Sequence, residues 1–288
     1  MDIVITGLLL GGTYALIAMG LNLQYGVARI MNLATGEMLV AGAFAAFWCH
    51  TAGQVSPLLS LLLVAPLAFA GNWMVYRFML RPLVRRARDP GQLEVDSILA
   101  TFGMAFIFVG IMLAGFGGDY FSYSYLVEPV DIFGATYALN RIVACLAAAA
   151  IGGLLCLWLY GTRTGVAMRA VAVSPRSAGL VGIDVPAMSA LAFALGGAVA
   201  ASGGALISTF LTMDASVGVL FTMKALVIVI MGGVGDMRGA ILAAVILGIA
   251  ETAVATLIDP GLTLAAAYLM FIAVLLFRPQ GLFGRRAA

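Results

Sequence analysis

The feature that most constrains this chain is a succession of nine apolar stretches along its 288 residues. A helix of roughly 20 apolar residues crosses a bilayer core about 30 Å thick, and most of the nine stretches reach that length. They lie at 3–23, 30–49, 56–79, 96–116, 138–160, 186–210, 217–233, 239–258 and 262–277. Only 10% of the residues are charged and 63% are hydrophobic, which excludes the polar surface that a soluble enzyme or a disordered chain needs. We therefore predict an all-α polytopic membrane protein that forms a single transmembrane domain over residues 1–288.

Two of the nine stretches are interrupted by polar residues or glycine. The stretch 30–49 contains Asn32, Thr35 and Glu37, and the stretch 217–233 contains a lysine and is followed closely by further glycine. Backbone leaves the helical conformation at membrane depth only where it is buried in protein or lines a cavity. We expect either stretch to form a broken or re-entrant helix, so the predicted number of transmembrane helices is eight or nine.

Arginine is distributed unevenly between the loops. With nine crossings, 13 of the 15 basic residues fall on one side of the membrane. They lie in 77–88, in 161–185, after 277 and in two short turns at Arg29 and Arg238. Loops rich in Lys and Arg face the cytoplasm. We therefore predict that the N-terminus lies outside and that the C-terminus is cytoplasmic.

Motifs of catalytic or metal sites are missing from the sequence. The chain has no G-x-x-x-x-G-K-S/T loop for a nucleotide, and its only histidine is His50. Cys49, Cys145 and Cys156 are well separated and lack metal-ligand spacing. The net charge of +2 gives no reason to expect nucleic acid as a partner. We predict no catalytic residue, no metal site and no cofactor bound by this chain.

Three ionisable residues fall inside the predicted membrane spans: Glu37, Lys224 and Glu251. Charges at such positions are costly and usually face a partner or a cavity. Lys224 and Glu251 each lie about seven residues from the outer ends of their spans, roughly 10 Å deep at 1.5 Å per residue. Equal depth and opposite charge predict an intramembrane ion pair, which either fastens the helices or serves transport. Glu37 either lines the solute path with Asn32 and Thr35 or is an acid favoured near a helix N-terminus.

The predicted cytoplasmic loop 161–185 has the pattern of two short helices. Helix-forming residues over 164–173 are followed by Ser-Pro at 174–175, which is a helix-start signal, and Gly182 ends the second helix. This second helix has a basic edge and an apolar edge, formed by Arg176 and by Leu180, Val181 and Ile183. The pattern is typical either of a segment gripped by a cytoplasmic partner or of an amphipathic helix lying on lipid.

Four groups of residues resemble the membrane permease subunit of branched-chain amino acid type ABC importers, the LivH type. They are the opening helix at 11–21, the Asn–Gly–Glu motif at 31–37, the cytoplasmic segment at 163–185 and the C-terminal block from Lys224 to Glu251. The resemblance covers nearly the whole chain, and the order and spacing of the groups make it specific. Thr35 stands where many members of this family carry His.

The resemblance implies a bacterial inner-membrane, multi-pass subunit that supplies half of a solute pathway. The cargo would be a branched-chain amino acid or a related amino acid, amide or urea-like solute. The implied partners are a second related permease subunit (a heterodimer), two cytoplasmic ATP-binding subunits and a periplasmic solute-binding protein. ATP and Mg would be bound by those partners, and hydrolysis would take place on them. The alternative is an ion-coupled secondary transporter that acts alone and uses Glu37, Lys224 or Glu251 as its ion site.

On the same resemblance, 161–185 is a coupling loop that transmits ATP hydrolysis to the membrane helices. The residues assigned to this coupling are Arg169, Pro175, Arg176, Ser177, Leu180, Gly182 and Ile183. The residues assigned to the solute pathway are Asn32, Thr35 and Glu37.

Overall fold

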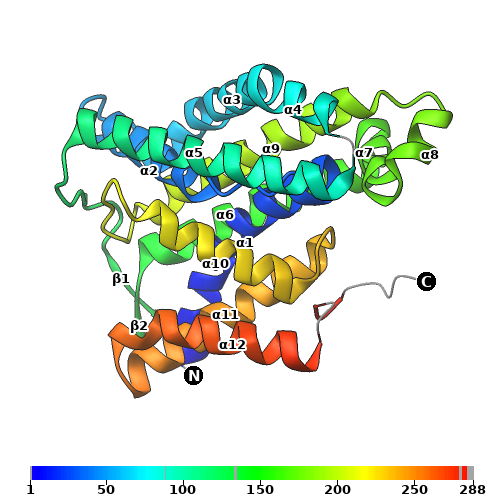
Figure 1. The fold of residues 1–288 in the computed structure, drawn as a ribbon. Coiled ribbons are helices and arrows are strands. Elements are labelled where there is room, and N and C mark those ends of the chain that lie inside the picture. The colour runs from blue at the N-terminus through cyan, green and yellow to red at the C-terminus, as the bar shows by residue number, and fades with distance from the viewer. Residues whose placement is uncertain (1, 88, 133–134, 279–280, 284–288) are drawn as a thin grey trace.

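The computed structural model describes residues 2–87, 89–132, 135–278 and 281–283 and is a bundle of helices (Figure 1). Within these residues, seven helices are long and apolar enough to cross a membrane, so the chain is a multi-pass membrane protein. Five are single α-helices: α1 (Asp2–Ala28), α5 (Pro90–Phe116), α6 (Leu139–Gly161), α9 (Val185–Ile207) and α11 (Met237–Leu257). The other two are α3 (Pro57–Val75), which continues through the π-helical turn Tyr76–Leu80 into α4 (Arg81–Arg86), and α12 (Thr263–Phe277), which follows the 3-10 turn Pro260–Leu262.

The two interrupted stretches form shorter helices, α2 (Thr35–Thr51) and α10 (Gly218–Gly232). They have 17 and 15 residues. At 1.5 Å per residue they are about 26 and 22 Å long, less than the roughly 30 Å of a bilayer core. A non-helical segment at 29–34 separates α2 from α1, and Arg29 has a φ of 56° at the start of this break. The polar residues that interrupt the second stretch therefore mark a real break between helices.

Helices α1 and α9 form the buried centre of the bundle. Residues from Gly7 to Ala28 of α1 are mostly buried, as are nearly all residues of α9 after Ala192. A helix that is apolar all round is expected in such an interior position. The two helices approach closely at Gly20 and Gly196, where a Cβ on either glycine would collide with the carbonyl oxygen of the other. Small residues allow this close packing in lipid, where burial of apolar surface gives no drive.

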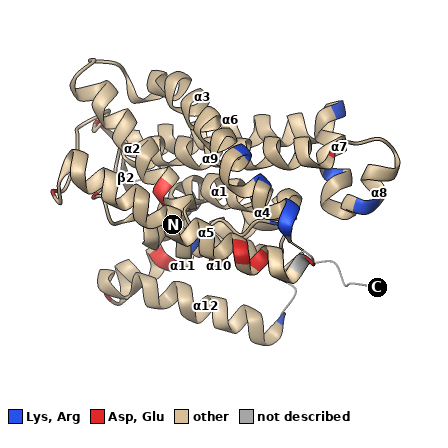
Figure 2. Cartoon of the chain, turned by 45° about the horizontal axis from the view of Figure 1, so that its top comes forward, with Lys and Arg blue, Asp and Glu red and all other residues tan. Residues whose placement is uncertain are grey.

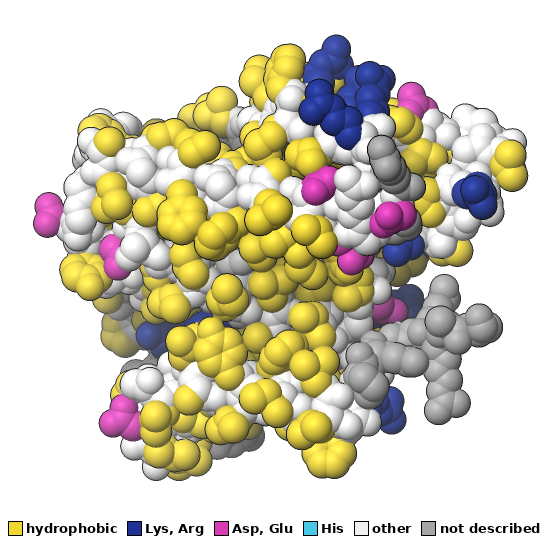
Figure 3. All heavy atoms as spheres, in the orientation of Figure 1, with side chains coloured by type: hydrophobic (Ala, Val, Ile, Leu, Met, Phe, Trp, Pro, Cys, Tyr) yellow, Lys and Arg dark blue, Asp and Glu magenta, His cyan; other side chains and the backbone are white. Residues whose placement is uncertain are grey.

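The outer helices α3, α5 and α12 expose apolar side chains at the surface of the chain. Leu62, Phe106 and Leu276 are among the most exposed of these. Apolar side chains cover most of the face drawn in Figure 3, and basic side chains gather at one end of it. An apolar belt between polar ends is the surface that a bilayer requires.

The two ends of the bundle differ in charge and in structure. Helices α4, α7 (Arg163–Val173) and α8 (Pro175–Leu180) lie at one end, and most of the basic residues that Figure 2 draws lie there (Figures 1 and 2). Arg88, Arg285 and Arg286, which we also assign to this side, lie outside the described residues.

The other end carries an antiparallel hairpin of β1 (Pro129–Ile132) and β2 (Ala135–Ala138), in which Val130 pairs with Tyr137. An all-α prediction does not include this hairpin. Its β-branched and aromatic residues favour strands over helix.

Candidate functional site

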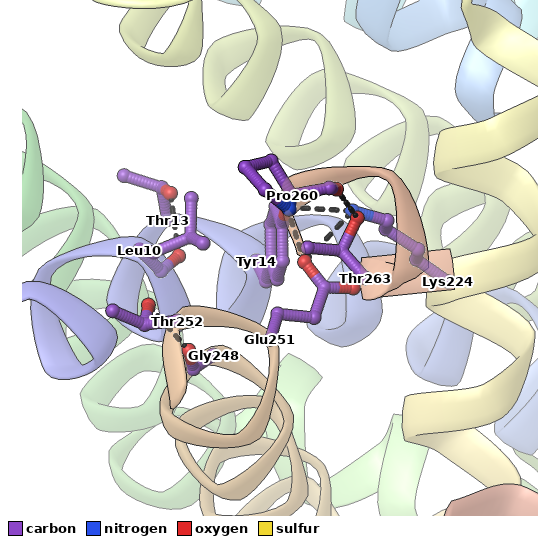
Figure 4. Close-up of polar contacts among 9 residues, drawn as sticks. All are labelled: Leu10, Thr13, Tyr14, Lys224, Gly248, Glu251, Thr252, Pro260 and Thr263. Carbon is purple, nitrogen blue, oxygen red and sulfur yellow. Dashed lines mark hydrogen bonds and ion pairs between the residues drawn. The ribbon is translucent and has the colours of Figure 1, made fainter. Parts of the chain in front are cut away.

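Lys224 and Glu251 meet inside the bundle, on neighbouring helices α10 and α11. Lys224 Nζ lies 2.8 Å from Glu251 Oε2 (Figure 4). The hydroxyl of Tyr14 in α1 completes the cluster: it accepts a hydrogen bond from Lys224 Nζ at 2.8 Å and donates one to Glu251 Oε2 at 3.0 Å. Lys224 Nζ also lies 4.8 Å from the centroid of the Tyr14 ring, which is within cation–π range. One polar cluster therefore joins three helices.

Burial makes this cluster a strong constraint on the packing of the three helices. The side chain of Glu251 is 3% exposed and that of Lys224 is 16% exposed. Removing one member of a buried ion pair leaves the other charge desolvated and unpaired. Glu251 Oε1 has no hydrogen-bond partner among the described residues. Equal depth in the sequence predicts the contact between Lys224 and Glu251 but does not predict the part of Tyr14. The only sign of it in the sequence is a hydroxyl inside an apolar span.

The break between α1 and α2 is held by a network of hydrogen bonds in which Asn32 takes a central place. Asn32 Nδ2 donates to Gln24 Oε1 at 3.0 Å, and Asn32 Oδ1 accepts from the backbone N–H of Ala34 at 3.0 Å. Thr35 Oγ1 donates to the carbonyl of Asn32 at 2.7 Å. Asn32 and Thr35 are both fully buried. In this conformation the two side chains fix the irregular backbone at the break.

Neighbouring helices supply the remaining partners of the break. Thr101 Oγ1 in α5 accepts a hydrogen bond from the backbone N–H of Leu33 at 3.1 Å. Thr222 Oγ1 in α10 accepts from the N–H of Gly36 at 2.8 Å and donates to the carbonyl of Leu33 at 3.2 Å. Irregular backbone inside a membrane protein needs such partners, because no water is present to satisfy it. Nothing in the sequence points to Thr101 and Thr222, since a threonine inside an apolar span usually bonds within its own helix.

Glu37 lies in the first turn of α2 and differs from its polar neighbours. The residue is 1% exposed, and neither carboxylate oxygen has a hydrogen-bond partner among the described residues. Its carboxylate lies against Gly218, the first residue of α10, where a Cβ would collide with the carboxylate. The positive end of the α10 dipole favours an anion at this place. Glu37 is thus a buried acid held beside a helix N-terminus with its hydrogen-bonding capacity unused.

A second polar contact of α1 fixes the glycine-rich turn between α10 and α11. Asn22 Oδ1 accepts from the N–H of Gly235 at 2.6 Å, and Asn22 Nδ2 donates to the carbonyl of Asp236 at 2.8 Å. Gly233 and Gly235 have φ values of 101° and 83°, a conformation that favours glycine. The turn therefore serves as a fixed connection between α10 and α11. Its sequence lacks the spacing of a nucleotide-binding loop.

The predicted coupling loop contains two short capped helices. Ser174 Oγ caps α8 by accepting from the N–H of Ser177 at 3.2 Å, and Gly182 ends the segment with a φ of 84°. Leu180 is 85% exposed, and Val181 and Arg176 are exposed beside it. Ile183 differs from the expected edge because it packs against the bundle core. The exposed apolar edge of α8 therefore consists of Leu180 and Val181.

Arg169 does not lie with the exposed residues of α8. Its Nε donates to the carbonyl of Leu159 at 3.1 Å, and its guanidinium lies 4.6 Å from the centroid of the Tyr160 ring. These contacts fasten α7 to the end of α6. Arg169 also lines a cavity of about 690 Å³ together with Arg29 and Tyr25. Its contacts suit a residue that positions the loop, whereas Arg176, Ser177 and Gly182 are exposed.

A family model described as "branched-chain amino acid transport system / permease component" matches residues 3–277. The chain belongs to this family. Members of this branched-chain amino acid permease family are transport subunits and not enzymes. The match includes both polar clusters, the break before α2 and the loop that carries α7 and α8.

Several relatives in the permease family align along almost their whole length. The high-affinity branched-chain amino acid transport system permease protein LivH of Salmonella typhimurium is 28% identical, covering 97% of this chain and 94% of the relative. The permease protein BraD of Pseudomonas aeruginosa, named for the same transport system, is 29% identical and covers 98% and 94%. A solved structure of PsaBC from Streptococcus pneumoniae in complex with Fab aligns over 98% of this chain and 94% of that chain, with 10% identity and a TM-score of 0.48. That TM-score is too low to support an argument from the fold.

Proposed function

We propose that the chain is the membrane-spanning permease subunit of an ATP-driven importer in a bacterial inner membrane. The solute is a branched-chain amino acid or a related small amino acid, amide or urea-like molecule, moved from the periplasm to the cytoplasm. The observation that carries this proposal is the family match over residues 3–277. The hairpin end of the bundle faces the periplasm and the arginine-rich end faces the cytoplasm, in accord with the positive-inside rule.

The proposed importer also contains a second, related permease subunit that forms a heterodimer with this chain, two cytoplasmic ATP-binding subunits and a periplasmic solute-binding protein. ATP and Mg are bound by the cytoplasmic subunits. The absence of a nucleotide-binding loop from the sequence supports this division of labour. The loop 161–185 couples the two parts, with α8 as the docking helix. The exposed Leu180 and Val181 beside Arg176 support that role, because they offer a partner an apolar contact with an adjacent charge.

Asn32, Thr35 and Glu37 border the solute pathway in this proposal. Glu37 supports the assignment, since a buried acid without hydrogen-bond partners is costly to retain for packing alone. Asn32 and Thr35 hold the break that places Glu37 opposite Gly218. The polar cluster holds α1, α10 and α11 together around this region through Tyr14, Lys224 and Glu251 Oε2.

Reconstitution of the complete complex in proteoliposomes tests the function. Leucine uptake should require ATP on the cytoplasmic side and the solute-binding protein on the other side. A complex whose ATP-binding subunits bind but do not hydrolyse ATP is the control and should not accumulate leucine. Uptake by this chain alone, driven by a proton or sodium gradient, would contradict the proposal and support the secondary transporter.

A further inference from the structure

A cavity of about 270 Å³ adjoins the ion-pair cluster on the side of the bundle that carries the hairpin. Its walls come from α1, α6, α11, α12 and the segment after α9. Five of its eleven lining residues are apolar, among them Leu9, Leu10 and Phe210, and four are threonines. The other two, Arg141 and Glu251, are charged. A lining that combines apolar side chains with polar groups is typical of small-molecule sites, and the volume suits a small metabolite.

The two charged groups of this cavity can each take a further partner. Arg141, in the first turn of α6, is exposed and has no hydrogen-bond or ion-pair partner among the described residues, and its guanidinium lies 5.8 Å from the Phe210 ring centroid. The two carboxylate oxygens of Glu251 lie in different environments. Oε2 is held by Lys224 and Tyr14, while the buried Oε1 has no partner among the described residues. An unpaired buried oxygen is costly, so a donor that reaches it would be favoured.

We propose that this cavity is a binding site for a zwitterionic α-amino acid with an aliphatic side chain. The ligand carboxylate pairs with the guanidinium of Arg141, and the ligand ammonium donates to Glu251 Oε1. The aliphatic side chain lies against Leu9, Leu10 and Phe210. This inference rests on the proposed function, and it deepens it by giving the solute a first contact on the periplasmic side.

The charges that line the cavity have the signs that such a ligand needs. Arg141 carries a positive charge and Glu251 a negative charge, so each end of a zwitterion meets a group of opposite sign. Arginine binds carboxylates with a matching two-donor geometry. A ligand that lacks the ammonium group would leave Glu251 Oε1 unpartnered. Both ends of an amino acid therefore have a complementary group in the cavity.

Equilibrium binding of radiolabelled leucine, without nucleotide, to the complex of permease and ATP-binding subunits in lipid nanodiscs tests the site. The solute-binding protein is left out, because it would itself bind leucine. Arg141→Met should weaken leucine binding by about ten-fold or more, the loss expected when a charge-assisted hydrogen bond is removed. Competition by 3-methylbutylamine, which lacks the carboxylate, should be the same in wild type and Arg141→Met. Competition by 4-methylpentanoate, which lacks the ammonium, should be weaker than that of leucine in wild type and should disappear in the variant.

A second variant tests the cavity by filling its volume and leaves the charged residues unchanged. Ala255→Phe places a ring in the cavity and should abolish leucine binding without altering charge. Leu257→Phe is the matched control, because Leu257 is 73% exposed on the same helix, outside the cavity, and should bind leucine like wild type. Equal melting temperatures of the two variants would show that the loss is local.

Two results would overturn the inference while leaving the proposed function intact. One is normal leucine binding and uptake in both Arg141→Met and Ala255→Phe. The other is a wild-type complex that transports leucine with ATP but whose leucine binding is not changed by either variant. A wild-type complex that fails to transport any amino acid with ATP would instead contradict the proposed function, so the two failures are distinguishable.

Discussion

Thr222 and Gly36 are 186 residues apart in sequence, yet Thr222 Oγ1 accepts a hydrogen bond from the N–H of Gly36 at 2.8 Å. The contact ties α10 to the first turn of α2 at the point where the chain leaves the break. Two residues later, Lys224 of the same helix bonds to Tyr14 and Glu251. Helix α10 is therefore positioned by polar contacts on both sides. In lipid, polar contacts of this kind provide part of the free energy of helix association that burial of apolar surface provides in water.

Replacing Thr222 by Val should destabilise the protein, because valine keeps the shape but leaves the N–H of Gly36 buried and unpaired. We expect a loss of about 1–3 kcal/mol in the free energy of unfolding. Denaturant titration of the purified protein in detergent measures it. Thr51→Val is the control, since Thr51 is exposed and its hydroxyl bonds only within its own helix. Equal stability of Thr222→Val and Thr51→Val would show that the contact does not fix α10.

The ion pair should behave as a coupled unit in a double-mutant cycle. Lys224→Met and Glu251→Gln should each lower stability by a few kcal/mol, because each leaves a buried charge unpaired. The double variant should recover part of that loss. Thermal melts measure the coupling, and strict additivity of the two shifts would mean that the side chains do not interact. A double variant that is stable but inactive in leucine uptake would assign the charges to transport.

Sequence alone predicted the helical membrane class, the break at the start of the stretch 30–49 and the capped helix that begins at Pro175. These follow from local rules of hydropathy and capping. The sequence also allows a break within the stretch 217–233, but α10 is continuous from Gly218 to Gly232. The contacts of Thr101, Thr222 and Asn22 were not predictable in the same way. Their partners are backbone groups on other helices, and which helix lies opposite is decided by close packing at residues such as Gly20 and Gly196.

The hairpin formed by β1 and β2 was missed for a different reason. The segment 117–140 lies between two apolar stretches and is rich in aromatic residues, which are equally typical of an interfacial belt. In a four-residue strand, the alternation of apolar and polar residues is too short to be recognised in such a segment. The pairing of Val130 with Tyr137 is a matter of register between the two strands, which hydropathy does not reveal.

Glu37 gives a separate test of the proposed pathway. Glu37→Met removes a buried acid that has no partner among the described residues, so the melting temperature should stay equal or rise. If Glu37 borders the solute path, ATP-driven leucine uptake by the complex should fall by about ten-fold or more, which corresponds to losing one charged contact. A lower melting temperature with proportionate loss of uptake would instead assign Glu37 a packing role beside Gly218. Melting and uptake measured on the same preparation separate these two roles.

The exposed edge of α8 leads to the last prediction, which concerns coupling. Arg176→Glu combined with Leu180→Asp reverses a charge and removes an apolar contact at two exposed side chains. Neither side chain supports the core, so membrane insertion and melting temperature should remain those of wild type. Solute-stimulated ATP hydrolysis and leucine uptake by the complex should both be lost, because the ATP-binding subunits no longer bind this helix.

A matched pair on the adjoining helix serves as the control for this change. Arg163→Glu combined with Val166→Asp makes the same charge and polarity changes on α7, where Arg163 and Val166 are also exposed. We expect this variant to retain more coupled transport than the α8 variant, because the proposed docking contact is confined to α8. Normal coupled transport in the α8 variant would refute the docking role and leave α8 as a helix that lies on lipid.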